Sequence, residues 1–97
     1  MIKAGDKFRV MTPTRASGVS KWARGYTGDF ECLIPEGTLL VAEADQAEGR
    51  SVFLLVPEDY AKMEEILVPQ SISRAARYEG YYFVFGNQDL DATIKKV

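Results

Sequence analysis

Residues 30–44 read FECLIPEGTLLVAEA, and this stretch gives the clearest indication of the fold. Apolar side chains alternate before the proline, at Phe30, Cys32 and Ile34, as they do in a strand with one buried face. Pro35 presets the backbone for the first half of a turn, and Gly37 can take the left-handed conformation that closes a three-residue loop. The pattern therefore predicts a β-hairpin over about residues 29–44.

The segments on either side of this hairpin also have the character of strands. A polar turn at residues 45–50 leads into SVFLLV (residues 51–56), so three consecutive strands are expected to form a meander. Residues 6–12 alternate with Phe8 and Val10 on one face, and residues 81–85 read YYFVF between two glycines. The unbroken apolar runs need cover on both faces, which either a curled sheet with a helix or a second copy of the chain could supply.

Helical spacing of apolar residues predicts two short helices, at about 58–67 and 89–96. Pro57 suits the first turn of the first helix. Asp89 is a candidate cap for the second, and two lysines fall near its C-terminal end, where the helix dipole favours them. Residues 70–78 fit either a helical turn or an extended segment. The apolar stripes are Tyr60, Met63, Ile66 and Leu67 in the first helix and Leu90, Ile94 and Val97 in the second.

Together these elements indicate an α+β, mainly β fold, with residues 1–97 forming a single domain. The opening GDKFRV (residues 5–10), followed by a long loop and a meander, resembles the layout of SH3-like small barrels. This resemblance covers few residues and carries no functional residue across. We expect a small SH3-like or strongly bent antiparallel barrel with one or two short helices.

The composition excludes several classes of chemistry. With no histidine and one cysteine, the chain cannot form a His-based triad, a His-ligated metal site or an intramolecular disulfide. Neither a Walker A loop nor a dinucleotide-binding glycine pattern is present, so no cofactor is predicted. No signal peptide or membrane-length apolar stretch is recognised, which predicts a cytoplasmic protein that does not enter a membrane.

The net charge of −2 conceals a strong division along the chain. Residues 1–28 hold six basic side chains and one acid, a balance of +5. Residues 29–70 hold ten acids and two bases, a balance of −8, and the remainder has a balance of +1. Whether the charges are also divided in space is not determined by the sequence.

The basic part contains the candidate binding site, a long Gly- and Ser-containing loop at about residues 13–28, for which a short strand or turn inside the loop is the alternative. Cations that contact phosphate, beside flat rings that stack on bases, are the components of single-strand binding, although Trp22 could instead cap the core. We predict a non-enzymatic binding or interaction module whose loop engages an anionic or extended partner. A protein partner or self-association is expected first, and a single-stranded nucleic acid is the alternative. The candidate binding residues are Arg15, Lys21, Trp22, Arg24 and Tyr26.

Carboxylate pairs give the remaining alternative, a carboxylate-based hydrolase. Asp29 with Glu31, and Asp89 with Asp91, are close in sequence, and two carboxylates held in a cleft can hydrolyse a glycosidic bond. Such pairs are more often solvated surface, and no residue is assigned a catalytic role. Cys32 lacks an activating histidine and is expected to be a small buried hydrophobe.

Overall fold

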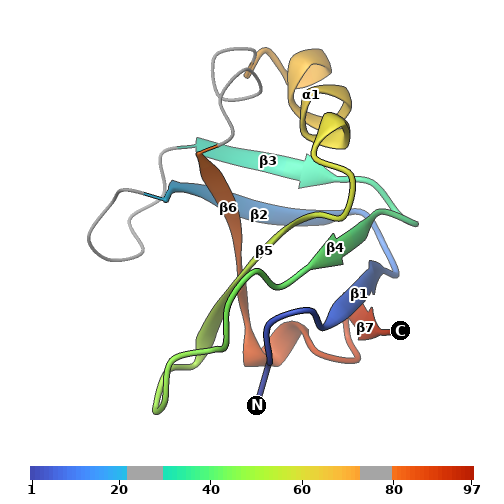
Figure 1. Ribbon diagram of the computed structural model, residues 1–97. Helices are drawn as coiled ribbons and strands as arrows, with labels where there is room; N and C mark the ends of the chain where they lie inside the picture. Colours follow the sequence, from blue (N-terminus) through green and yellow to red (C-terminus); the bar gives the residue numbers. More distant parts are fainter. Residues whose placement is uncertain (22–29, 73–79) are drawn as a thin grey trace.

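The computed structural model describes residues 1–21, 30–72 and 80–97, and in them seven strands form one antiparallel sheet (Figure 1). The strand order is β3-β2-β6-β5-β4-β1-β7. Within these residues, a mainly β fold with one short α-helix is thus confirmed. The elements are β1 (Lys7–Val10), β2 (Thr14–Ser20), β3 (Phe30–Ile34), β4 (Leu39–Val41), β5 (Val52–Pro57), α1 (Ala61–Leu67), a 3₁₀ turn η1 (Val68–Gln70), β6 (Tyr81–Gly86), a second 3₁₀ turn η2 (Asn87–Asp89) and β7 (Ile94–Lys96).

The centre of the sheet is a meander of β4, β5 and β6. The β2–β3 hairpin extends it beyond β6, while β1 and then β7 extend it beyond β4. Strand β5 belongs to both halves, because residues 52–55 pair with β6 and residues 56–57 pair with β4. The outermost strands β3 and β7 are not paired with each other in the described part of the chain, so the sheet is not closed into a barrel.

One hydrophobic core receives side chains from every strand and from α1. Phe53 of β5 lies between Phe8 of β1 and Phe85 of β6, with ring centroids 6.0 and 6.3 Å away. Met63 and Leu67 on the inner face of α1 are fully buried in the same core. Because both outermost strands contribute to a single core, the sheet must curl around it, and α1 packs against β3 and β5 to cover the core.

The predicted hairpin at residues 29–44 is wrong in its pairing, although its turn is present. Gly37 has φ +88°, and the Thr38 hydroxyl donates to the Pro35 carbonyl at 2.7 Å. Yet among the described residues β3 pairs with β2 and with no other strand, and β4 pairs with β1 and β5. The Gly37 N–H donates to the Val10 carbonyl, and the Val10 N–H donates to the Thr38 carbonyl. After the turn, the chain therefore pairs with β1 and not with β3. The meander consists of β4, β5 and β6, so it begins one strand later than predicted.

The predicted loop at residues 13–28 is wrong over its first half, which is the long strand β2 between β3 and β6. Strand β2 reads TRASGVS, so most of its side chains are small or polar and the apolar alternation typical of a strand is absent. At Gly18, a Cβ atom would collide with the ring of Phe30 on the neighbouring strand. The close approach of Phe30 thus requires glycine at position 18 of β2, and glycine is a residue type that is unusual in strands. Residues 22–29 lie outside the described residues.

The predicted helix at residues 89–96 is also wrong, because this segment is a turn followed by β7. The Asp89 carboxylate accepts hydrogen bonds from the Gly86 N–H at 2.9 Å and the Thr93 hydroxyl at 3.0 Å. Asp91 adopts a left-handed conformation with φ +63°, which no helix interior allows. Asp89 accepts hydrogen bonds as a capping residue does, but it closes a turn and does not begin a helix. After this turn, Ile94 pairs with β1.

The other predicted helix is shorter than expected, since α1 begins at Ala61. Pro57 is not in the first turn of the helix but is the buried last residue of β5. The Asp59 carboxylate accepts a hydrogen bond from the N–H of Ala61, the first residue of α1. Among the described residues, no helix has the length and apolarity that a membrane span requires. The helical turn or extended segment predicted for residues 70–78 lies largely outside the described part, since residues 73–78 are not described.

Candidate functional site

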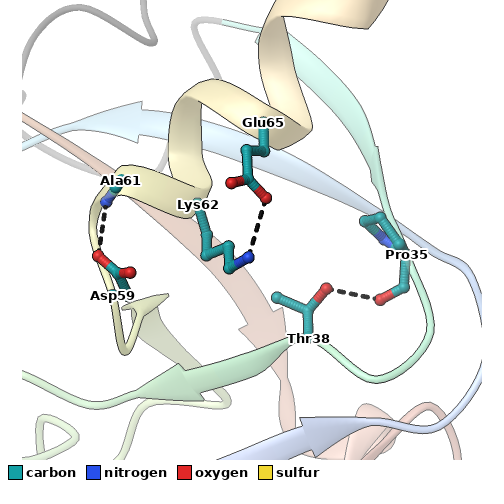
Figure 2. Close-up of polar contacts among 6 residues, drawn as sticks. All are labelled: Pro35, Thr38, Asp59, Ala61, Lys62 and Glu65. Atoms are coloured by element: carbon teal, nitrogen blue, oxygen red, sulfur yellow. Dashed lines mark hydrogen bonds and ion pairs between the residues drawn. The ribbon is translucent and has the colours of Figure 1, made fainter.

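A groove with a volume of about 420 Å³ runs between α1 and the turn that follows β3 (Figure 2). One wall is the turn, and the other is formed by the end of β5 and the first two turns of α1. The lining residues are Pro35, Gly37, Thr38 and Leu39 on the first wall and Glu58, Asp59, Lys62, Glu65 and Ile66 on the second.

The floor of the groove is apolar because α1 has its hydrophobic stripe turned inward. Ile66 is buried against the core and forms the edge of that stripe. Pro35 and Leu39 face it from the turn, and Leu39 remains 36% exposed, a large apolar side chain left partly open to solvent. This combination gives the groove an apolar surface that a ligand could cover.

The rim of the groove carries charge. Lys62 and Glu65 lie one helical turn apart, and the Lys62 ammonium contacts the Glu65 carboxylate at 3.0 Å (Figure 2). The hydrogen bond to Glu65 raises the pKa of Lys62. Glu58 pairs with Lys7 of β1 at 3.3 Å. Three of the four ionisable lining residues are acids, so the rim is negative overall.

Both walls are held by local hydrogen bonds, one of which uses the rim carboxylate of Asp59. The Thr38–Pro35 bond fixes the turn, and the Asp59 carboxylate accepts the Ala61 N–H at 3.1 Å at the start of α1 (Figure 2). The Glu58 N–H also donates to the Leu39 carbonyl, which ties the two walls together. A groove formed by such local bonds is organised before any ligand arrives, which reduces the entropy cost of binding.

The candidate binding residues found from sequence are only partly described. Trp22, Arg24 and Tyr26 lie outside the described residues. Arg15 is on β2 with its side chain 78% exposed, and its guanidinium lies 3.9 Å from the Glu31 carboxylate. Lys21 follows the end of the same strand, about 20 Å further along at the usual rise per residue. The structure therefore does not bring these two cations together.

Lys21 lies in a cluster that the sequence did not reveal. Its ammonium contacts both carboxylate oxygens of Glu43, at 3.1 and 3.3 Å. It also lies 4.9 Å from the ring centroid of Tyr82 and 5.7 Å from that of Tyr60, within cation–π range of both. Burial of the phenol, together with the Glu43 charge, raises the pKa of Tyr82. Lys21 is thus a neutralised, mostly covered cation rather than an exposed one.

The acidic pairs have local contacts of their own. Glu31 is exposed beside Arg15, Asp89 closes the turn before β7, and Asp91 is exposed in that turn. Cys32 is buried as expected, and burial raises the pKa of its thiol to about 11. Within residues 1–21, 30–72 and 80–97, no group of three or more Asp, Glu or Cys side chains is arranged to hold a metal ion. Asp29 lies outside those ranges.

Comparison with models of protein families, with curated proteins and with solved structures finds no match to this chain. No relative therefore supplies a ligand or an activity. The chemistry of the groove must be inferred from its own side chains, of which the sequence indicated only the surplus of acids in residues 29–70.

Proposed function

We propose that this protein is a non-enzymatic binding module whose groove holds a short segment of a partner protein. The segment presents one apolar side chain next to a lysine or arginine. The single observation that carries this proposal is the apolar floor of Leu39 and Ile66 beneath a rim of three acids and one base. The apolar side chain covers the floor, and the basic one meets Glu65 or Asp59.

The size and energetics of the groove favour such a ligand. About 420 Å³ lies within the range of sites that enclose small ligands, and it also suits one or two side chains of a peptide. The Lys62–Glu65 pair is solvent-exposed, with side chains 54% and 65% accessible, so rearranging it costs little. An incoming cation can therefore replace Lys62 beside Glu65 without a large penalty.

A selection from a library of random displayed peptides tests this proposal. We expect enriched peptides to combine Leu, Met or Phe with an adjacent Lys or Arg, and to lose affinity for Glu65→Lys and Leu39→Ser variants. Glu48→Lys is the matched control, because it makes the same charge change in the turn before β5, at the end of the molecule away from α1 (Figure 1). Enrichment of acidic peptides, or equal binding by Glu65→Lys and Glu48→Lys, would refute the proposal.

Self-association through the same groove is the second form of this function. The exposed lysines of one copy could serve as the basic partner of another. Sedimentation at increasing concentration separates the cases: a dimer dispersed by Glu65→Lys assigns the groove to a second copy, and a monomer at all concentrations rules a second copy out.

The basic-aromatic segment remains a second candidate site, for an anionic or extended partner or a single-stranded nucleic acid. Exposed Arg15 at its start favours it. If Arg15, Lys21, Trp22, Arg24 and Tyr26 bind phosphates and bases, affinity for a labelled oligonucleotide falls steeply with salt and falls again in Arg15→Glu. Flat salt dependence would rule out a nucleic acid as the ligand of this segment.

Two wider proposals accompany the function. We propose that the sheet is a strongly bent relative of SH3-like small barrels, with β5 as the strand that turns from one half to the other. We also propose a cytoplasmic location, in keeping with the free thiol of Cys32.

A further inference from the structure

Three segments that are far apart in sequence converge on the ammonium group of Lys21. Lys21 follows β2, Glu43 follows β4, Tyr60 precedes α1 and Tyr82 lies in β6. Two carboxylate oxygens and two aromatic rings surround the nitrogen atom, at 3.1 and 3.3 Å and at 4.9 and 5.7 Å from the ring centroids. The Lys21 side chain is only 21% exposed. A simple surface ion pair needs none of this aromatic enclosure.

We propose that Glu43, Tyr60 and Tyr82 form a binding site for the alkylammonium group of a partner's lysine side chain, with or without methyl groups, and that Lys21 occupies this site in the free protein. The three residues are called the cation cage below. The cage shares no residue with the lining of the groove beside α1, so variants can be chosen that change one site and keep the residues of the other.

The chemistry of the cage fits an alkylammonium ion. Aromatic rings attract a cation through their negative faces, and this attraction is strongest where the cation has lost water. A carboxylate on the remaining side supplies the opposite charge. A methylated ammonium gives up its hydration more readily than a free one, so it gains more from the rings and less from hydrogen bonds to Glu43.

Lys21 can leave the cage without disturbing the sheet. Its backbone is fixed independently, because its N–H donates to the Gly80 carbonyl at 2.6 Å. Only side-chain rotation is needed to empty the site. Tyr82 also lines a small cavity of about 110 Å³ together with Ala44 and Asp45, so the wall of the cage borders open space rather than solid core.

Because Lys21 belongs to the same chain and occupies the cage, it lowers the affinity of the cage for an external cation. An external ligand binds only the conformers in which Lys21 has left, so its apparent dissociation constant rises by the inverse of that fraction. If one molecule in ten is open, removing the Lys21 side chain strengthens binding about tenfold. The free protein is thus a closed form of the site, which a partner's lysine opens by competition.

The wild-type chain allows a first test that depends on no variant. Ring currents from Tyr60 and Tyr82 should shift the side-chain NMR signals of the Lys21 ε-methylene upfield, and choline should move them back toward the positions of an exposed lysine. Choline's neutral isostere, with carbon in place of nitrogen, should leave them unchanged. An unshifted ε-methylene, or equal effects of choline and its isostere, would overturn the proposal.

Variants provide the second test, with choline titrated against each by NMR. Lys21→Ala should bind choline more tightly than wild type, by about tenfold for an open fraction of about one in ten. Lys21→Arg, which keeps a cation in the cage, should not. Tyr82→Leu added to Lys21→Ala should abolish binding. Dispersed amide spectra confirm that each variant is folded. Equal choline affinity in Lys21→Ala and Lys21→Arg, or retained affinity after loss of Tyr82, would refute the cage.

Discussion

The strand that sequence patterns missed makes the sharpest prediction about stability. Gly18 of β2 is paired with Phe30 of β3, and the space its side chain would fill is taken by the Phe30 ring. That ring packs in turn against Tyr81, with centroids 5.4 Å apart, so it cannot simply turn away. We therefore expect Gly18→Ala to destabilise the protein by forcing the two strands or the ring apart.

The magnitude follows from two opposing effects. Overpacking a filled site costs typically about 1–3 kcal/mol. Replacing a strand glycine by alanine recovers about 0.5–1 kcal/mol of backbone entropy. The expected net loss is about 1–2 kcal/mol, which lowers the midpoint of urea unfolding by roughly 1 M for a chain of this size.

A double-mutant cycle isolates the cause. In a Phe30→Ala background the obstructing ring is gone, so Gly18→Ala should instead stabilise the protein, by about 0.5–1 kcal/mol. Urea unfolding of the four proteins gives the coupling between the two positions directly. A Gly18→Ala variant as stable as wild type, or the same effect in both backgrounds, would show that Phe30 does not require the glycine.

Three further perturbations test other parts of the structure. Gln70→Ala should promote self-association measured by sedimentation, because the Gln70 amide bonds both the N–H and the carbonyl of an edge residue of β3, at 2.7 and 2.8 Å, and removing it opens that edge. Cys32 should react with a thiol reagent at pH 8 only as fast as the protein opens, because its buried thiol has a pKa of about 11. The pKa of Asp6 is lowered by the Lys3 N–H and by Lys96, so its stabilising contribution is present above its unfolded pKa and is lost as pH falls through its folded pKa. Asp6→Asn should remove that part of the pH dependence in acid titrations of urea stability.

The elements that sequence patterns predicted well are those whose apolar spacing is dictated by one buried face. Phe8 and Val10 alternate in β1 with exposed Lys7 and Arg9. The apolar run of β6 likewise corresponds to a central strand with neighbours on both sides. Local pattern suffices for these because burial itself creates the pattern.

The missed elements depend on contacts between distant residues. Glycine at position 18 of β2 leaves room for the Phe30 ring of β3, so this residue of β2 is explained by a neighbouring strand and not by β2 itself. Strand β7 exists because Ile94 can pair with β1, which overrides helical spacing. The groove likewise forms only when the Glu58 N–H bonds the Leu39 carbonyl across strands. No local pattern records these partners.

The division of charge along the sequence does not become a division in space. Strand β1 pairs with β4, and β2 pairs with β3, so antiparallel pairing brings the basic first segment against the acidic second one. Four of the six ion pairs of the described residues join these two segments. They are Lys3–Asp45, Lys7–Glu58, Arg15–Glu31 and Lys21–Glu43.

This interleaving decides where unbalanced charge remains. Four of the five described cations of the first segment lie in ion pairs with acids of the second, which weakens the attraction of the described surface for nucleic acid. The acids of α1 and its approach are more numerous than the bases near them, with Lys62 the one basic residue of the helix. The acids of α1 thus remain in excess beside the apolar groove, which supports our proposal of a basic protein segment rather than a phosphate backbone as the partner.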